Sequence, residues 1–427
     1  MTIQNFYTEI FLNHPTISTD SRSITPGCVF FALSGENFNG NTFAAQAIEQ
    51  GAAYAVVDDT NLASNERCIV VEHVLQFLQQ VAAYHRRQCR AKIIAITGTN
   101  GKTTTKELIS AVLSQKFNTI NTLGNLNNHI GVPLTLLRIT ADTEIAIVEM
   151  GANHEKEIAF LCSIAQPDYG IITNVGKAHL QGFGSFEGVI RTKTELYDSI
   201  KAHGGTIFQD FDNEILRAND KEITNCVSYA FNADAQYRGE LVRTSLFAAF
   251  CFVHGGSRTF IQSNLFGEYN AKNMLAAAAI GAYFGVSDKA IQTAIEHYTP
   301  TNNRSQLQKT AHNTLILDAY NANPTSMRAA IEAFAQVEQA HKTLILGEMF
   351  ELGEDAQKEH QAIIKLIDSL KFTSVFLVGN WHAHTHYNHF ATAHDLKTYL
   401  TAHPLKQQYI FIKGSRGVKL ETVVDVL

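Results

Sequence analysis

Residues 96–108, ITGTNGKTTTKEL, combine glycines, a lysine and threonines at a spacing that suits phosphate chemistry. Gly98 and Gly101 would let backbone N–H groups wrap around a phosphate, and Lys102 would reach the outer phosphates of a nucleotide. A complete GxxxxGK[ST] motif requires glycine at position 96, where this chain has Ile96, so an ordinary glycine-containing turn is the alternative. The expected phosphate-binding residues are Gly98, Thr99, Asn100, Gly101, Lys102, Thr103 and Thr104.

Two further residues with metal-ligand chemistry follow apolar runs that are typical of buried strands. Glu149 lies at the end of EIAIVEM, and His179 follows GIITNV. The carboxyl ends of parallel strands line the ligand crevice of an open sheet, so both side chains would face Thr103. Taken singly, such residues are more often surface or capping residues. Their shared placement favours a site for a magnesium–nucleotide complex.

The elements that would position these residues are short apolar runs, each followed by a turn and a helical pattern. Runs at 91–97, 144–150 and 169–175 predict βα units of a parallel sheet, and closely spaced strands over 206–262 predict a mixed or antiparallel extension. Residues 28–59 alternate strand and helix patterns in a smaller unit. Runs at 314–320, 342–349, 374–379 and 408–414 predict a further α/β unit after the turn-rich linker 298–304. The pattern therefore favours an α/β protein of three domains.

Composition narrows the class of protein. The 427 residues are 45% hydrophobic and carry a net charge of -6 without a long basic run, which argues against a nucleic-acid partner. The six cysteines form no CxxC pair, as expected of a reducing cytosol. The longest apolar stretch is too short to span a bilayer, so we expect a cytoplasmic protein without stable membrane insertion.

Seven segments, taken in chain order, resemble the Mur ligase family. They are GTNGKTTTKE (98–107), TLGNLNNHIGVPLTLL (122–137), VEMGANHEKEI (148–158), TNVGKAHLQGFGS (173–185), LDAYNANPTSM (317–327), LGEMFELG (346–353) followed by His360, and KGSRG (413–417). The resemblance begins at DSRSITPGCVFFALSGENFNGNTF (20–43) and so covers nearly the whole chain. A single motif of this kind would be weak evidence, whereas the ordered set is specific.

The resemblance implies a fold and a reaction. The implied fold has a small N-terminal α/β domain that binds UDP (residues 1–88), a central P-loop ATPase domain with a mostly parallel sheet (89–300) and a C-terminal Rossmann-like domain (301–427). In the implied reaction, ATP with Mg²⁺ phosphorylates the carboxylate of UDP-N-acetylmuramoyl-tripeptide, and the amine of D-alanyl-D-alanine then forms the amide. This would be the last cytoplasmic step of peptidoglycan precursor synthesis. These two small molecules are the expected partners, and we expect a monomer.

The resemblance also assigns residues. Lys102, Lys193 and His179 would be catalytic, and the metal ligands would be Thr103, Glu149, His179 and Lys193, the last as a carbamate. Without the family, Lys193 is a solvated helix lysine beside Glu195. Residues on the nucleotide side would be Asn270, Asn273, Arg304 and Asp318. The substrate-binding residues would be Ser21, Arg22, Ser34, Gly35, Asn125, Asn127, Asn128, Tyr320, Asn321, Asn323, Lys413, Ser415 and Arg416.

Some of these residues have an alternative role, and two positions depart from the family. The Asn/Gly block 124–128 could be a simple turn, and Asn323 could cap a helix as well as contact a substrate. Relatives commonly have histidine where this chain has Tyr269, and Asp-Gly where it has Asn39-Gly40. The segment DAYNANP favours D-alanyl-D-alanine addition over diaminopimelate addition, because the relatives that add diaminopimelate show a DNPR-like motif. Whether the third residue of the tripeptide is diaminopimelate or lysine stays open.

Alternative classes lack supporting features. A regulatory GTPase would require an NKxD element, which is absent, and a passive nucleotide-binding module would not need Lys102, Thr103, Glu149 and His179 together. Folylpolyglutamate synthetase shares the ATPase core, but would lack the N-terminal unit and the NANP block. The stretch 381–390 carries His382, His384, His386 and His389, a pattern typical of a solvated surface and, less often, of a transition-metal site. We expect the domains to close when ATP and the UDP-tripeptide bind.

Overall fold

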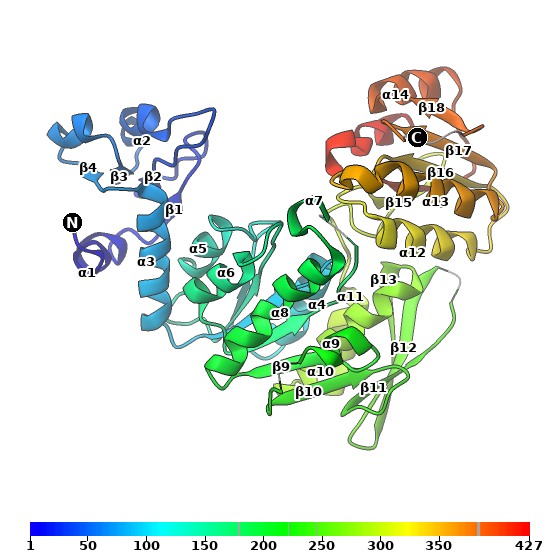
Figure 1. Ribbon diagram of the computed structural model, residues 1–427, viewed down its shortest axis with the longest axis horizontal. Helices are drawn as coiled ribbons and strands as arrows, with labels where there is room; N and C mark the ends of the chain where they lie inside the picture. Colours follow the sequence, from blue (N-terminus) through cyan, green and yellow to red (C-terminus); the bar gives the residue numbers. More distant parts are fainter. Residues whose placement is uncertain (178–179, 221, 245, 382–384) are drawn as a thin grey trace.

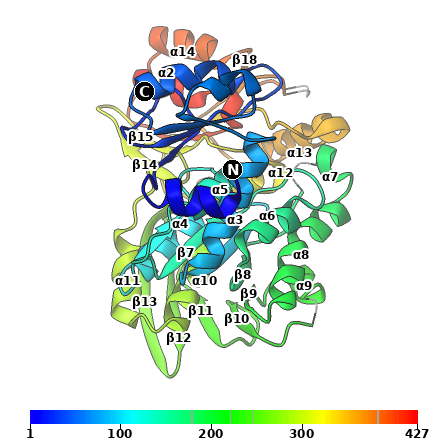
Figure 2. The same ribbon diagram turned by 90° about the vertical axis from the view of Figure 1, so that its left-hand side faces the viewer.

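The computed structural model describes residues 1–177, 180–220, 222–244, 246–381 and 385–427. Three α/β domains follow one another along the chain, each built on one sheet (Figure 1). Within the described residues the sheets have four, nine and six strands. The N-terminal and C-terminal domains stand apart on opposite sides of the central domain, as the two views show (Figures 1 and 2).

The N-terminal domain is a small parallel sheet in the order β1-β2-β3-β4. Its elements are α1 (Ile3–Asn5), η1 (Phe6–Phe11), β1 (Ile17–Ser18), β2 (Val29–Phe31), η2 (Gly40–Phe43), α2 (Ala44–Glu49), β3 (Tyr54–Val57), η3 (Thr60–Ser64), β4 (Cys68–Val70) and α3 (Val74–Gln88). Helix α3 buries Phe77, Leu78 and Val81 at helical spacing. One continuous apolar core joins these side chains to Phe6 and to residues of the central domain, so α3 packs the two domains against each other.

The central domain carries the residues with phosphate chemistry. Its elements up to α8 are β5 (Lys92–Thr97), α4 (Lys102–Leu113), β6 (Thr119–Asn121), α5 (Gly131–Leu136), β7 (Ile145–Glu149), α6 (Glu157–Ala165), β8 (Tyr169–Ile172), α7 (Leu180–Phe183) and α8 (Phe186–Ala202). They continue with β9 (Thr206–Asp210), α9 (Glu214–Ala218), β10 (Cys226–Ala230), β11 (Tyr237–Leu241), β12 (Phe247–His254), β13 (Ser257–Phe266), η4 (Glu268–Asn270), α10 (Ala271–Tyr283) and α11 (Asp288–His297).

The order of the central sheet is β13-β12-β11-β10-β9-β8-β5-β7-β6. Strand β5 lies between β7 and β8 and pairs with both in parallel. All five residues of β7 are buried, which explains its uninterrupted apolar sequence. Strands β11, β12 and β13 are antiparallel, so the mixed extension predicted for residues 206–262 is confirmed. The carboxyl ends of β5, β7 and β8 therefore meet at one edge.

The C-terminal domain has the sheet order β14-β15-β19-β16-β17-β18, parallel except for β14. Its elements are β14 (Gln306–Lys309), β15 (Thr314–Asp318), α12 (Pro324–Ala335), β16 (Lys342–Gly347), η5 (Gly353–Asp355), α13 (Ala356–Asp368), β17 (Ser374–Val378), β18 (Asn388–Phe390), α14 (Ala393–Ala402), β19 (Tyr409–Lys413), η6 (Arg416–Val418) and η7 (Leu420–Val426). The three-domain α/β fold predicted from the sequence is confirmed.

Three sequence expectations concern membrane spans, the cysteines and the histidine-rich stretch. Among the described residues, no helix combines the length and apolar character needed to cross a membrane. All six cysteines are free thiols. In the histidine-rich stretch, His382 and His384 lie outside the described residues, whereas His386 and His389 are exposed. No group of three or more possible metal-binding side chains occurs in the described part of the chain.

Candidate active site

The phosphate loop joins β5 to α4. Gly101 caps the helix with φ 77° and Gly98 has φ 139°, conformations that favour glycine. Space is equally restrictive: a Cβ at Gly98 would lie 2.1 Å from Thr173 Oγ1, and one at Gly101 would lie 2.6 Å from Asn273 Oδ1. Both glycines are therefore required by backbone conformation and by packing. The loop keeps the predicted strand-to-helix position although residue 96 is isoleucine.

The segment after β8 holds this loop in place. The N–H of Thr99 donates to the Asn174 carbonyl (3.0 Å), and the N–H of Asn100 donates to Asn174 Oδ1 (3.0 Å). Thr173 Oγ1 donates in turn to the Asn100 carbonyl at 2.6 Å. Two neighbouring strand ends thus hold one loop in place at the N-terminus of α4, a position whose free N–H groups suit an anion.

Lys102 bends back over the loop. Its Nζ donates to the carbonyls of Gly98 (2.6 Å) and Thr99 (3.2 Å). Burial lowers the pKa of Lys102 to about 8, with Glu149 opposing the shift and the positive charge of Arg304 adding to it. The ammonium therefore stays mostly charged at pH 7 and is held where phosphate oxygens would meet the loop.

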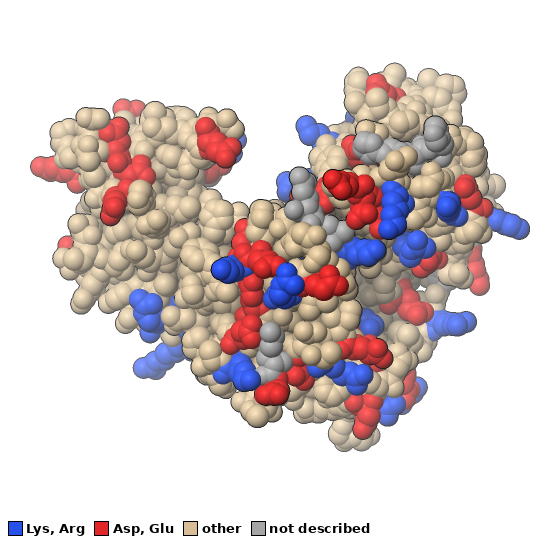
Figure 3. Space-filling model, in the orientation of Figure 1, with Lys and Arg blue, Asp and Glu red and all other residues tan. Residues whose placement is uncertain are grey.

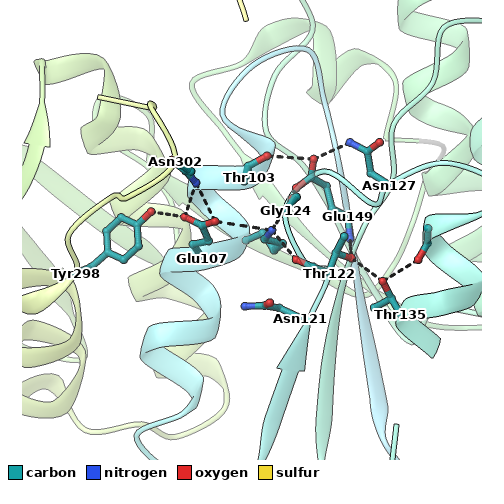
Figure 4. Close-up of polar contacts among 12 residues, drawn as sticks. Thr103, Glu107, Asn121, Thr122, Gly124, Asn127, Thr135, Glu149, Tyr298 and Asn302 are labelled. Atoms are coloured by element: carbon teal, nitrogen blue, oxygen red, sulfur yellow. Dashed lines mark hydrogen bonds and ion pairs between the residues drawn. The ribbon is translucent and has the colours of Figure 1, made fainter. Parts of the chain in front are cut away.

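Glu149 is 1% exposed and has an oxygen without a hydrogen-bond partner. Its Oε1 accepts from Thr103 Oγ1 (3.2 Å) and Asn127 Nδ2 (2.8 Å), whereas the nearest cation to Oε2 is Lys106 Nζ at 3.7 Å (Figure 4). A buried carboxylate oxygen without a donor normally carries a large free-energy cost. A carboxylate beside a hydroxyl is also the hard-oxygen ligand set that Mg²⁺ prefers, so these residues fit the implied metal.

Lys193 lies on α8 and is 3% exposed. Its Nζ donates to the Ala152 carbonyl (3.4 Å) and lies 5.2 Å from the centre of the Phe183 ring. Burial, with a smaller effect from the charge of Lys102, lowers the pKa of Lys193 to about 7. A large share of this amine is therefore neutral near pH 7, which is the form that carbamylation requires. The solvated surface lysine, the alternative for this residue, is excluded.

Asparagines on the opposite wall are linked by hydrogen bonds. Asn273 Nδ2 donates to Asn270 Oδ1 (2.8 Å), and Thr105 Oγ1, on the helix of the phosphate loop, donates to Asn273 Oδ1 (3.1 Å). Asn270 Nδ2 donates to Ser305 Oγ (3.1 Å), which also contacts the Tyr269 hydroxyl (3.1 Å). Tyr269, at the position that departs from the family, thus contributes a bond to the linker.

The C-terminal domain contributes charged and aromatic groups. The Arg304 guanidinium stacks 3.9 Å from the centre of the Tyr320 ring, and Arg416 lies 5.2 Å from the same centre. Lys413 Nζ donates to Asp318 Oδ2 (2.6 Å) and to the Asn321 carbonyl (3.2 Å). These contacts fix the DAYNANP and KGSRG segments against each other.

Asn323 has two roles at once. Its Oδ1 accepts from the N–H of Ser326 (2.9 Å), which caps α12, and Pro324 occupies the first helical turn. Its Nδ2 donates to Asn100 Oδ1 at 2.7 Å, so the cap also touches the phosphate loop of the central domain. The helix-cap expectation is confirmed, and the contact across domains is additional.

Most of these groups, but not Asn323 or Arg416, line a cavity of about 910 Å³ between the central and C-terminal domains. Many of the site residues expected from the sequence line this cavity. They are Gly98, Thr99, Asn100, Gly101, Lys102, Thr103, Thr104, Asn125, Asn127, Asn128, Glu149, Lys193, Asn270, Asn273, Arg304, Asp318, Tyr320, Asn321 and Lys413. The sequence missed the Lys272–Asp210 ion pair (3.0 Å) in the wall. The only sequence feature that pointed to this ion pair was the position of Asp210 at the end of a predicted strand.

Three family models match this chain, one after another in the order of the three domains. Residues 15–86 match the Mur ligase family catalytic domain, 96–281 the Mur ligase middle domain, and 303–416 the Mur ligase glutamate ligase domain. The chain belongs to the Mur ligase family.

Within the Mur ligase family, similar proteins share one description. The UDP-N-acetylmuramoyl-tripeptide--D-alanyl-D-alanine ligases of Bacillus subtilis and Escherichia coli are each 35% identical, over 96% of this chain and 92% and 93% of theirs. MurF from Acinetobacter baumannii superposes with a TM-score of 0.86 at 31% identity, covering 96% of this chain and 92% of that one. MurF ligase from Thermotoga maritima in complex with ADP, at 24% identity and 97% coverage of both chains, shares the fold with a TM-score of 0.85.

Some residues that the Mur ligase resemblance assigned lie away from the cavity. Arg22 pairs with Asp20 (2.8 Å), and Ser34 Oγ donates to Asn39 Oδ1 (3.1 Å), both in the N-terminal domain. Figure 3 shows the open hollow that separates this domain from the C-terminal domain. Ser21 and Gly35 also belong to the N-terminal domain and do not line the cavity, and His179 lies outside the described residues. Ser415 is buried and accepts from the Phe350 N–H at 2.9 Å.

Proposed function

We propose that this chain uses ATP to join D-alanyl-D-alanine to UDP-N-acetylmuramoyl-tripeptide through an acyl phosphate. The observation that carries the proposal is the cavity in which the phosphate loop, the Glu149 oxygen that accepts no hydrogen bond and the loops of the C-terminal domain face one another. The 35% identity to two ligases of that description over 96% of the chain supports the choice of substrates.

The nucleotide would bind with its phosphates on the loop 98–104 and its base toward Asn270 and Asn273. Arg304 and Asp318 would lie on the phosphate and ribose side. Lys102 would exchange its two loop carbonyls for phosphate oxygens. Removing a cation from neutral partners and giving it anionic ones is favourable in a site with little water. The carbonyls of Gly98 and Thr99 hold the ammonium in place until then.

The metal site would consist of Thr103, Glu149, His179 and carbamylated Lys193. Bound there, Mg²⁺ would neutralise charge on the phosphates and the attacking carboxylate. Thr103 and Glu149 are already in contact, which fixes the position of both oxygens before a cation arrives. A neutral Lys193 amine would add carbon dioxide and lose a proton to form the carbamate.

The chemical steps follow from charge and geometry. The tripeptide carboxylate attacks the γ-phosphorus, the bond to ADP breaks, and an acyl phosphate forms. The dipeptide amine attacks the acyl carbon, loses a proton, and phosphate leaves with the bonding electron pair. Lys102 would stabilise negative charge in the first step, and positioning would supply most of the rate enhancement. The amides of Asn125, Asn127 and Asn128 would both donate to and accept from the peptide.

The substrates would span the domains. We assign the UDP end to Ser21, Arg22, Ser34 and Gly35 in residues 1–88, and ATP to residues 89–300 with Arg304 and Asp318 added from the C-terminal domain. The dipeptide is assigned to residues 301–427. In that last region Tyr320, Asn321, Asn323, Lys413, Ser415 and Arg416 would contribute. The hollow between the outer domains would narrow when the UDP-tripeptide and ATP bind. A monomer acting in the cytoplasm suffices for this scheme.

The test is phosphate release from ATP with purified protein, Mg²⁺ and UDP-N-acetylmuramoyl-tripeptide, run with D-alanyl-D-alanine, with another dipeptide, and without any amine. We expect release to require both the tripeptide and D-alanyl-D-alanine, with a pentapeptide product identified by mass. Release that needs neither substrate would refute the proposal. Lys92→Ala serves as a control for lysine substitution, because that exposed side chain lies outside the cavity.

A further inference from the structure

The linker between the central and C-terminal domains is tied to the helix of the phosphate loop. Glu107, on the first turns of α4, accepts a hydrogen bond from the Tyr298 hydroxyl. The amide Nδ2 of Asn302 donates to both carboxylate oxygens of Glu107, at 3.0 and 3.1 Å (Figure 4). Tyr298 and Asn302 are separated from Glu107 by 191 and 195 residues in sequence. The Glu107 carboxylate therefore holds the linker at two points, Tyr298 and Asn302.

The chain is fixed again three residues after Asn302, directly after the linker. Ser305 is buried and its Oγ contacts the Tyr269 hydroxyl and Asn270 Nδ2, each at 3.1 Å. Asn303 and Ser305 have φ values of 55° and 52°, conformations that residues other than glycine adopt rarely. The backbone on both sides of Arg304 thus has an unusual shape that the anchors at Asn302 and Ser305 maintain.

Arg304 is the residue held between these two anchors. Its guanidinium lies 3.9 Å from the centre of the Tyr320 ring and lines the cavity. It is close enough to the phosphate loop for its charge to act on Lys102. The fixed backbone on both sides removes backbone freedom, and stacking on Tyr320 restricts the many rotamers of the arginine. Together they lower the entropy cost of placing its guanidinium on a ligand.

We propose that Glu107 is a positioning residue that fixes Arg304 for nucleotide binding by anchoring the interdomain linker to the phosphate-loop helix. The inference rests on the proposed function, because it takes Arg304 to contact the nucleotide. Glu107 does not line the cavity. Its hydrogen-bond donors among the described residues are Tyr298 and Asn302, through which it acts on the linker. Lys106, whose Nζ lies 3.9 Å from Glu107 Oε1 and bonds to the Thr122 carbonyl (2.7 Å), offsets the charge of the carboxylate.

The decisive experiment is a double-mutant cycle on ADP affinity, measured by calorimetry without the other substrates. Glu107→Ala should weaken ADP binding about tenfold, and Arg304→Ala by at least as much. If Glu107 acts through Arg304, the double variant should bind ADP no more weakly than Arg304→Ala alone. Losses that multiply in the double variant would overturn the proposal, as would a Glu107→Ala variant with the affinity of the wild type.

Two further variants separate positioning from general loosening. Lys116→Ala removes a comparable tether just after the C-terminal end of α4, where Nζ donates to the Phe284 and Gly285 carbonyls at 3.0 Å each. This variant should leave ADP affinity unchanged. Tyr298→Phe removes a single hydroxyl and should weaken ADP binding less than Glu107→Ala, with KM for ATP rising while KM for the UDP-tripeptide stays constant. Equal losses in Lys116→Ala and Glu107→Ala would overturn the proposal.

The same titrations distinguish this inference from the proposed function. If the wild type binds no ADP, both fail together. If the wild type binds ADP and ligates the substrates while Glu107→Ala is indistinguishable from it, only the role of Glu107 fails.

Discussion

The phosphate loop and the expected UDP-binding surface differ in how far they are assembled. Around the loop, Thr99, Asn100, Lys102 and Thr103 all have protein partners, and Asn323 reaches them from another domain. On the N-terminal domain, the Arg22 side chain is 87% exposed, and within the described residues it bonds only to Asp20, two residues earlier. The central site is preorganised, whereas the N-terminal one is an open surface.

This difference suggests that the two regions contribute to different steps, the central site to the chemistry and the N-terminal surface to substrate binding. A preorganised site loses little conformational entropy when its ligand binds, so electrostatic effects there should be large. An exposed surface loses more conformational entropy when its side chains become ordered on binding. It should contribute to substrate affinity more than to the chemical step. Substitutions on the two sides should therefore alter different kinetic constants.

The largest effect is expected at Lys102. Lys102→Ala removes the only ammonium that is bonded to the loop carbonyls in the described structure, and should lower kcat about a thousand-fold. UDP-tripeptide affinity, measured by calorimetry, should stay within a factor of about two. A Lys102→Ala variant that loses UDP-tripeptide binding would mean that the two regions are not separate.

The Lys193→Met substitution tests how strongly burial in the preorganised site lowers the pKa of the lysine. Lys193→Met should lower kcat about a hundred-fold and also change how stability depends on pH. With a folded pKa of about 7 against 10.5 for an exposed lysine, the unfolded wild type binds more protons between these values. Stability of the wild type should therefore rise with pH, by on the order of 2 kcal/mol from pH 7 to 9, beyond any rise in the variant. Thermal unfolding in carbon-dioxide-free buffer measures this, and parallel curves for the two proteins would contradict it.

Asn323 tests the bridge between domains. Asn323→Ser keeps an oxygen that caps α12 but loses the amide bonded to Asn100, whereas Asn323→Ala loses both. Activity should fall about tenfold in both variants, and only the alanine variant should lose about 1 kcal/mol of stability. Steady-state rates and urea unfolding separate the two roles. Full activity of Asn323→Ser would show that the amide contact has no part in the reaction.

The smallest effect is expected on the open surface. Arg22→Ala should raise KM for the UDP-tripeptide about fivefold, the size of one exposed charged contact, with kcat and ADP affinity unchanged. Arg67→Ala is a matched control in the same domain, because its Nε donates to the Ala53 carbonyl (3.0 Å) and not to the expected site. If Arg22→Ala instead lowered kcat, the proposed division between the two regions would be wrong.

Much of this arrangement could be predicted from the sequence. The buried strands β5, β7 and β8 have uninterrupted apolar runs, and the order of strand, glycine loop and helix places Lys102 and Glu149 at one edge. The motifs also indicated which asparagines and which C-terminal loop would line the cavity. Roles of individual residues in binding and catalysis stay predictions.

Other features could not be predicted because they depend on contacts distant in sequence. Lys106 and Glu107 read as ordinary polar residues of an amphipathic helix, yet one is buried against Thr122 and the other holds Tyr298. The low pKa of Lys193 requires knowledge of the Phe183 and Lys102 surroundings. The distance of Ser34 from the cavity reflects domain placement, which local patterns do not encode.

The position of β5 between β7 and β8 has a consequence for synthesis on the ribosome. A nascent chain that ends at Leu113 contains the whole phosphate loop and its helix, but neither neighbouring strand. The loop gains its first wall with β7 and its second only when Thr173 and Asn174 emerge after β8. Domains generally fold as units, the N-terminal one first, as the chain emerges. Nucleotide should therefore be unable to assist folding until the chain has grown well past residue 174.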